Sequence, residues 1–162
     1  MVGILMRAIT YSTLFIGFLL VYLPARALSW AGIGVQDHLG MPQIVGAVAT
    51  LVGALIAVWC ILSFAVIGRG TPAPFDPPRR LVVRGPYRYV RNPMYLGASL
   101  ALAGAALFYL SGALLAYTVG FFLLMYAFVV WYEEPTLRQT FGEDYEAYCR
   151  QVHRWLPARQ AG

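Results

Sequence analysis

Residues 92–132 read NPMYLGASLALAGAALFYLSGALLAYTVGFFLLMYAFVVWY, and this stretch decides the fold because it contains no Asp, Glu, Lys or Arg. A helix rises about 1.5 Å per residue and needs roughly 20 apolar residues to cross the hydrocarbon of a bilayer. The stretch is therefore far too long for one crossing. Ser111 and Gly112 near its middle favour a tight turn, so we predict a helical hairpin with spans at about 94–110 and 113–132.

Two further uncharged runs precede the hairpin, at 8–25 and 38–68. They predict single spans at about 8–25 and 44–67. The first run also has an early Arg7 and a small-residue ARA sequence at 25–27, so a cleaved signal peptide is an alternative. The preferred fold class is all-α: a polytopic membrane protein with four transmembrane helices, one hairpin and an amphipathic C-terminal tail. We predict a single domain over 1–162.

The composition agrees with this fold. The 162 residues are 60% apolar and 12% charged, whereas soluble domains carry about a quarter charged residues. This excludes a soluble globular protein. The net charge of +5 comes from twelve Arg, no Lys and seven acids, and beside apolar segments it points to anionic lipid headgroups as partners and not to nucleic acid. The exclusive use of Arg suggests a GC-rich bacterial genome, hence a bacterial inner membrane.

The charges also predict the orientation. Six Arg stand against Asp76 in the loop at 69–91, while the loop at 24–42 has Arg26 against Asp37. Positive charge collects on the cytoplasmic side. We therefore expect a cytoplasmic loop at 68–93, a cytoplasmic tail at 133–162 and both termini in the cytoplasm.

Small residues recur four positions apart in two predicted spans, which would let two helix backbones approach closely. Chance placement in an Ala-rich chain is an equal alternative, and the oligomeric state stays open. The residues are Ala49, Gly53 and Ala57 in one span and Gly97, Ala101 and Ala105 in the next.

The segment GPYRYVRNPMYLG (85–97) leads from the loop into the third predicted span. Pro93 suits the first turn of a helix, and Asn92 can cap that helix. A helix N-terminus among arginines can bind a carboxylate or phosphate group. Simple anchoring at the interface is the alternative. The arginines are Arg84, Arg88 and Arg91.

Two acids, Glu133 and Glu134, directly follow the fourth predicted span. Acids at a helix C-terminus oppose the helix dipole and are costly to desolvate at the edge of the hydrocarbon. We therefore expect them to accept hydrogen bonds from hydroxyls or an ammonium group; the alternative is that both lie in water. Neither cysteine nor histidine spacing predicts a metal site.

The tail after Pro135 predicts a short helix to Phe141, a break at Gly142 and an amphipathic helix over about 143–152. One face of that helix would lie on the membrane or cover a pocket. Its residues are Tyr145, Tyr148, Cys149 and Val152.

Four pieces together, GPYRYVRNPMYLG (85–97), EEP (133–135), FGEDYEAY (141–148) and VHRWLP (152–157), resemble the isoprenylcysteine carboxyl methyltransferase and phospholipid methyltransferase group. The resemblance covers about half of the chain. It implies an integral membrane enzyme that uses S-adenosylmethionine, with the cofactor on the cytoplasmic side between the loop, the last helices and the tail.

The resemblance also implies the site residues. Where the group usually has His, this chain has Asn92, which cannot carry a proton, and the usual Val-Pro-Arg-Trp ending reads VHRW at 152–155. The catalytic residues implied are Glu133, Glu134 and Arg154. The cofactor-binding residues implied are Tyr87, Tyr89, Val90, Arg91, Asn92, Pro93, Tyr95, Gly97, Glu133, Glu134 and Trp155.

Methyl transfer from a sulfonium needs mainly alignment of donor and acceptor, which can contribute roughly 7–11 kcal/mol. A carboxylate or thiolate acceptor needs no base, whereas an amine must lose a proton, for which Glu133 or Glu134 would serve. We expect a lipid-like or isoprenoid-linked acceptor. Two alternatives stay open: an NADPH-dependent membrane reductase of the steroid-reductase-like group, which has a similar Arg-x-Pro element, and a nonenzymatic four-helix membrane protein.

Overall fold

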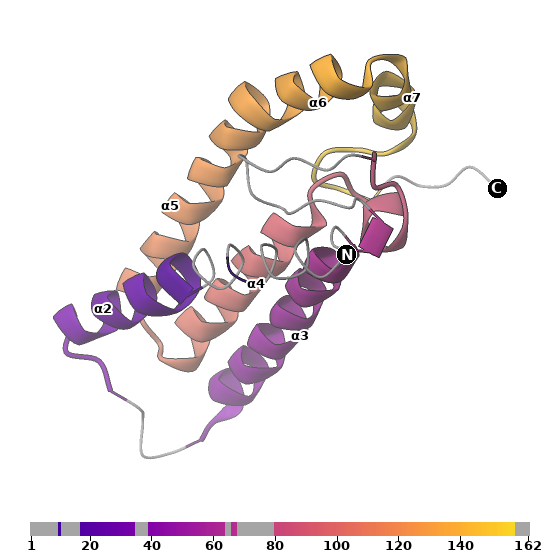
Figure 1. Ribbon diagram of the computed structural model, residues 1–162. Helices are drawn as coiled ribbons and strands as arrows, with labels where there is room; N and C mark the ends of the chain where they lie inside the picture. The colour runs from indigo at the N-terminus through magenta and orange to yellow at the C-terminus, as the bar shows by residue number, and fades with distance from the viewer. Residues whose placement is uncertain (1–9, 11–16, 35–38, 64–65, 68–79, 158–162) are drawn as a thin grey trace.

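The computed structural model describes residues 10, 17–34, 39–63, 66–67 and 80–157, and every regular element in these ranges is helical (Figure 1). The all-α prediction is therefore confirmed for the described residues. The longer elements are α3 (Met41–Ser63), α4 (Pro93–Phe108) and α5 (Gly112–Phe128). The shorter ones are η1 (Gly17–Tyr22), α2 (Leu23–Trp30), η3 (Gly85–Arg88), η4 (Val129–Glu133), α6 (Glu134–Phe141) and α7 (Glu143–Gln151).

The first predicted span is only partly described, because positions 8–9 and 11–16 lie outside the described residues. From Gly17 the π-helical turn η1 runs directly into α2, so the helix continues to Trp30 rather than ending near 25. The hydroxyl of Tyr117 on α5 donates a hydrogen bond to the carbonyl oxygen of Leu19 at 2.7 Å. This segment therefore contacts the hairpin.

Two described helices are long and apolar enough to cross a membrane: α3, with 23 residues, and the continuous helix Gly112–Phe141, with 30. α4 is equally apolar in character but shorter, with 16 residues. The four-span arrangement stays a prediction. The predicted end of the second span at 67 also stays a prediction, because residues 64–65 lie outside the described residues.

The predicted turn between the hairpin helices is confirmed. α4 ends at Phe108, and Leu110 adopts a positive φ of 48°. The hydroxyl oxygen of Ser111 then accepts a hydrogen bond from the Leu114 amide at 3.2 Å, which caps α5. A side-chain cap of this kind satisfies an amide that has no partner within the helix.

The helix after the hairpin differs from the prediction of a separate short helix beyond Pro135. α5, η4 and α6 form one continuous helix from Gly112 to Phe141. Pro135 lacks the amide hydrogen that an α-helix interior would use. The π-helical turn η4 directly precedes it, and such turns shift the hydrogen-bond register, so the helix passes Pro135 without ending.

α3 and α4 pack with their backbones in close contact. A Cβ atom on Gly53 would lie 2.5 Å from the Gly97 carbonyl oxygen, and one on Gly104 would lie 2.6 Å from the Gly46 carbonyl oxygen. Only glycine fits at such distances. The hydroxyl of Thr50 also donates to the Ala101 carbonyl oxygen at 3.2 Å, which adds a hydrogen bond between the helices.

The predicted small-residue faces are thus correct at Gly53, Ala57, Gly97 and Ala101 but shifted at the other two positions. Ala49 and Ala105 are only half-buried, and the close contacts fall on Gly46 and Gly104 instead. The reason is the 3.6-residue repeat: a helix face advances by three and four positions alternately, not always by four.

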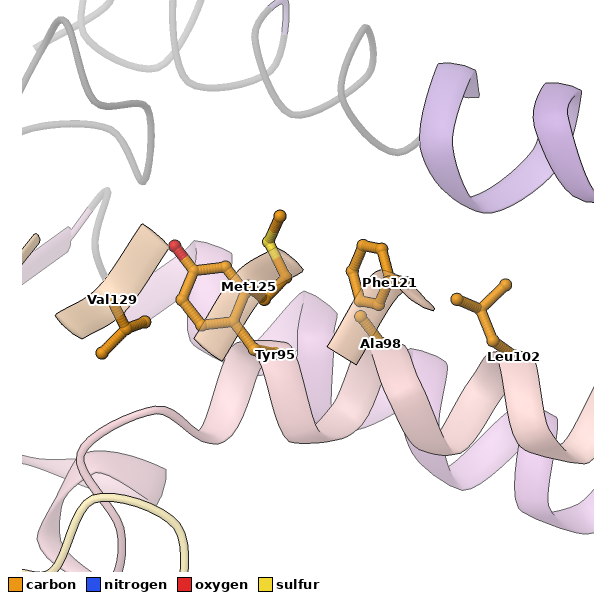
Figure 2. Packing of buried hydrophobic residues seen from close by; sticks show 6 residues of the cluster. All are labelled: Tyr95, Ala98, Leu102, Phe121, Met125 and Val129. Carbon is orange, nitrogen blue, oxygen red and sulfur yellow. The ribbon is translucent and has the colours of Figure 1, made fainter. Parts of the chain in front are cut away.

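Between α4 and α5 lies the main apolar cluster, shown in Figure 2. Its side chains lie between the two hairpin helices, with Val129 and Tyr95 toward one end of the row and Leu102 at the other. The buried members are Tyr95, Ala98, Leu102, Phe121, Met125 and Val129.

The C-terminal helices arch over the ends of α3 and α4 (Figure 1). The predicted break is confirmed at Gly142, whose φ of 52° ends α6 before α7 begins. The amphipathic face of α7 packs against the chain itself, because Tyr145, Tyr148 and Val152 form a cluster with Leu81 and other neighbours. α7 therefore covers the protein with this face.

Candidate functional site

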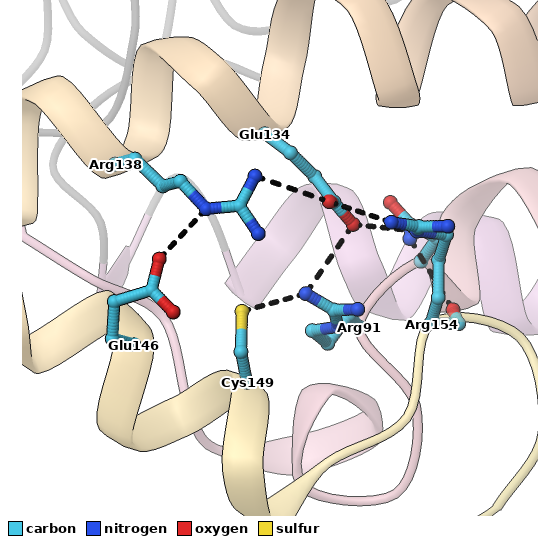
Figure 3. Close-up of polar contacts among 7 residues, drawn as sticks. Arg91, Glu134, Arg138, Glu146, Cys149 and Arg154 are labelled. Carbon is cyan, nitrogen blue, oxygen red and sulfur yellow. Dashed lines mark hydrogen bonds and ion pairs between the residues drawn. The ribbon is translucent and has the colours of Figure 1, made fainter.

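Glu134 is the centre of the polar site (Figure 3). It begins α6 and is only 2% exposed. The guanidinium of Arg154 binds both carboxylate oxygens, with Nε 2.7 Å from Oε1 and Nη2 2.8 Å from Oε2. This bidentate geometry is the strongest form of an Arg–carboxylate pair, so Arg154 ties the C-terminal tail to the start of α6.

Two further guanidinium groups surround the same carboxylate. Nη1 of Arg91 lies 3.3 Å from Oε1 of Glu134, and Nη1 of Arg138 lies 3.6 Å from Oε2. Arg138 also donates from Nε to Oε1 of Glu146 on α7 at 2.7 Å. The cluster therefore brings three guanidinium groups to two carboxylates and carries a surplus of positive charge.

The tail runs alongside the residues that precede α4. The Arg91 amide donates to the His153 carbonyl oxygen at 2.9 Å, and the side-chain amide of Asn92 donates to the Arg154 carbonyl oxygen at 3.2 Å. α4 begins after Asn92 as predicted, but Asn92 makes no side-chain cap. Its amide group is directed to the tail instead, so this residue joins two parts of the site.

Glu133 differs from its neighbour. It ends η4, is half-buried, and accepts a hydrogen bond at Oε2 from the Tyr95 hydroxyl at 2.9 Å. Successive helical residues point about 100° apart, so Glu133 faces α4 while Glu134 faces the arginines. The two adjacent acids therefore occupy different environments.

Two predicted cofactor residues carry buried nitrogen atoms that have no hydrogen-bond partner in the described part of the chain: Nε of Arg91 and Nε1 of Trp155. Both atoms are donors, and a buried donor without an acceptor is costly. Nη1 of Arg91 contacts Sγ of Cys149 at 2.6 Å. Arg91 therefore contacts the Cys149 sulfur, shares the Glu134 carboxylate, and keeps Nε as a buried donor without an acceptor in the described residues.

The indole of Trp155 lies on the last turns of α5. Its ring centroid is 5.1 Å from that of Phe122 and 6.0 Å from that of Tyr126. These aromatic contacts hold the end of the tail against the hairpin. The preceding residue of the tail, Arg154, binds Glu134 in the ion-pair cluster that also includes Arg91.

Tyr87 lies in a different layer of the structure. It is buried with Cys60 and Val82, and its carbonyl oxygen accepts a hydrogen bond from the Tyr148 hydroxyl at 2.6 Å. Burial raises the pKa of the Tyr87 and Tyr148 hydroxyls above their ordinary values, so both stay protonated. Tyr87 therefore links η3 to α7.

Four other predicted residues have surroundings of their own. Tyr89 is 51% exposed, with the Arg88 guanidinium 5.3 Å from its ring centroid. Gly97 serves the contact with α3. Val90 and Pro93 are buried and fix the backbone on either side of Arg91 and Asn92.

Sequence reasoning missed Arg138 and Glu146, and it gave Cys149 only a place on an amphipathic face. Arg138 stands four residues after Glu134 in α6, and acid–base pairs at this spacing meet on one helix face, so a local signal for it existed. The contacts of Glu146 and Cys149 depend on the reversal at Gly142, which no local pattern measures.

Comparison with known proteins places the chain. The phospholipid methyltransferase family matches residues 41–144, more than half of the chain. The chain is also 34% identical over 86 residues to probable protein-S-isoprenylcysteine O-methyltransferases of Oryza sativa subsp. indica and subsp. japonica, a match that covers 51% of this chain and 44% of each relative. No solved structure matches the chain. The chain belongs to the phospholipid methyltransferase family.

Proposed function

We propose that this protein is a membrane methyltransferase that takes the methyl group from S-adenosylmethionine and transfers it to a lipid-like or isoprenoid-linked acceptor. Family membership supports the reaction class. One observation carries the site: residues of three distant segments, Arg91, Glu134 and Arg154, meet around a single buried carboxylate. Distant segments that converge on one charged centre are typical of a binding site built by the fold.

The residues fit this cofactor. S-adenosylmethionine has a carboxylate, ribose hydroxyls and ring nitrogens that accept hydrogen bonds, and Arg91 Nε and Trp155 Nε1 are buried donors without acceptors in the described residues. When bound, the cofactor supplies an electrophilic methyl group on a sulfonium. We propose that Arg91 and Trp155 hold its polar groups, while Glu133 and the ring of Tyr95 face its cationic end.

The two acids have different roles in this proposal. Both oxygens of Glu134 are already bound by Arg154, with Arg91 and Arg138 nearby. A carboxylate paired in this way holds side chains in position and is a poor base. Glu133 accepts one hydrogen bond, from Tyr95, so it is the acid that can accept a proton or hydrogen bond from an acceptor.

The location of the site suits an amphiphilic acceptor. The site forms where the apolar part of the Gly112–Phe141 helix gives way to polar residues. A molecule with its chains in the bilayer and its reactive group at headgroup depth would reach this level. The curated relatives are named for an isoprenylcysteine acceptor and the family for phospholipids. The chain spans less than half of those relatives, so the acceptor is part of the proposal.

The first experiment measures cofactor binding. Detergent-purified protein is titrated in a calorimeter with S-adenosylmethionine and, separately, with NADPH. The proposal requires saturable binding of the first and none of the second. Binding of NADPH alone would favour the reductase, and binding of neither would favour a nonenzymatic protein. Arg91→Met should weaken binding at least tenfold, whereas Arg150→Gln, a change on the exposed side of α7, should not alter it.

A second experiment separates the acceptor classes. Transfer of a labelled methyl group is measured to a prenylcysteine, to phosphatidylethanolamine and to an isoprenoid alcohol, with wild type and Glu133→Gln. If the acceptor is an amine, loss of the base should lower kcat by roughly 10²-fold or more. If it is a carboxylate, kcat should fall far less, because no proton has to be removed.

A further inference from the structure

Three arginines before α4 have no acidic partner among the residues that the structure describes. Arg80, Arg84 and Arg88 are exposed, and the ion pairs of the described residues all involve other arginines. Arg84 precedes η3 and Arg88 ends it. Two uncompensated guanidinium groups therefore flank one short turn, in contrast to the arginines gathered around Glu134.

The turn η3 is seated on the end of α3. A Cβ atom on Gly85 would lie 3.4 Å from Nε1 of Trp59 and 3.5 Å from Oγ of Ser63, the last residue of α3. α3 has 23 residues and is about 35 Å long, only slightly more than the roughly 30 Å hydrocarbon layer. With α3 across the bilayer, Arg84 and Arg88 would lie at the depth where the hydrocarbon ends and the headgroups begin.

The neighbours of these arginines have the character of a membrane interface. Trp59 is 57% exposed and Tyr89 is 51% exposed, and the Arg88 guanidinium lies over the Tyr89 ring. Val83, beside Arg84, is exposed as well. Aromatic rings with arginines at one level are typical of contact with lipid headgroups.

We propose that Arg84 and Arg88 bind the headgroup phosphate of an anionic phospholipid, at a position separate from the Glu134 cluster. Two unpaired guanidinium groups attract an anion, and the exposed rings of Trp59 and Tyr89 suit the adjoining glycerol and acyl chains. The segment continues through Val90 into Arg91, so a lipid bound at η3 holds the start of the functional segment at a fixed depth. This site does not depend on the proposed methyl transfer.

The experiment uses native mass spectrometry of the full chain released from nanodiscs that contain equal amounts of dioleoyl-phosphatidylcholine and dioleoyl-phosphatidylglycerol. We expect retained phosphatidylglycerol to exceed phosphatidylcholine. Near the membrane surface each arginine changes the preference roughly fivefold, so Arg84→Gln with Arg88→Gln should abolish most of it. Arg84→Lys with Arg88→Lys keeps both charges and should retain it, and Arg150→Gln on α7 should match wild type.

Equal retention of the two lipids by wild type would overturn the proposal, and so would an unchanged preference in the double Gln variant. Loss of phosphatidylglycerol upon addition of inorganic phosphate, but not of sodium chloride at the same ionic strength, would assign the arginines to free phosphate and would also overturn it. A measurement on wild type alone tests the proposal even if the variants fail to fold. The preference for phosphatidylglycerol should fall as salt is raised, because salt screens exposed charges. A preference that does not depend on salt would contradict the proposal.

Discussion

Glu134 is a buried carboxylate that three guanidinium groups share. Removal of its charge leaves Arg154 and Arg91 close together without compensation. Loss of one partner of a buried ion pair typically costs about 3 kcal/mol or more. We therefore expect Glu134→Gln to lower the free energy of unfolding by about that amount, measured by thermal unfolding followed by circular dichroism in one detergent.

Glu146 provides the matched control. It pairs with Arg138 through an exposed ion pair, in which both side chains are close to half exposed. Exposed pairs contribute less than about 1 kcal/mol, so Glu146→Gln should change stability little. Equal destabilisation by the two variants would show that the burial of Glu134 does not increase its contribution to the free energy of unfolding.

Asn92 makes a contact that does not depend on protonation, since its side-chain amide donates to the Arg154 carbonyl oxygen. Asn92→His introduces a group that titrates between about pH 5 and 8. Below its pKa the imidazolium would repel Arg91 and Arg154. Activity of the variant should therefore fall as the pH falls through this range, while the wild-type profile stays flatter. Identical pH profiles would show that this position does not sense charge at the site.

At this scale the sequence did not predict how the site residues pair. Glu133 and Glu134 were both expected to accept hydrogen bonds from hydroxyls or an ammonium group. In the structure Glu133 accepts a hydrogen bond from Tyr95, whereas Glu134 is bound by Arg154. Arg154 stands twenty residues from Glu134, and their contact needs the reversal at Gly142, which is a tertiary feature.

Among the elements, α3 and α4 depend on glycine at their crossing. Gly53→Ala would place a Cβ atom 2.5 Å from the Ala101 nitrogen and the Gly97 carbonyl oxygen, both backbone atoms that cannot rotate away. Overpacking of this kind costs about 1–3 kcal/mol, and we expect a loss of that size in thermal unfolding. Gly120→Ala on α5, where nothing lies within 4 Å, should be neutral or slightly stabilising; similar losses in both would contradict the close crossing.

The elements themselves were largely predictable. Uncharged runs and the Ser111–Gly112 turn predicted the hairpin, and the break at Gly142 was found from its residue type. The uninterrupted helix across Pro135 was not, because local rules end a helix near proline. A π-helical turn changes that rule, and it leaves no clear pattern in one sequence.

For the whole molecule, the orientation follows from the charges alone and stays a prediction. Cytoplasmic termini would place the Glu134 site where the proposed soluble cofactor can reach it. A green fluorescent protein fused to the C-terminus should fluoresce, and alkaline phosphatase fused there should be inactive. The opposite pair of results would invert the orientation. Fusions within the 24–42 loop should behave in the reverse way. The bacterial origin likewise stays a prediction, drawn from the use of arginine.

The continuous helix Gly112–Phe141 has a consequence for the molecule as a whole. Its 30 residues extend about 45 Å, well beyond the roughly 30 Å of hydrocarbon. A transmembrane helix that is longer than the hydrocarbon layer adapts to a change in bilayer thickness by tilting. Glu133 and Glu134 belong to the part of this helix that extends beyond the hydrocarbon, whereas their partners Tyr95 and Arg91 belong to the segment around the start of α4. We therefore expect a tilt of the long helix to change the distances between these acids and their partners. We expect the proposed methyl transfer in vesicles to peak at one acyl-chain length, which would make membrane thickness itself a regulator of that activity.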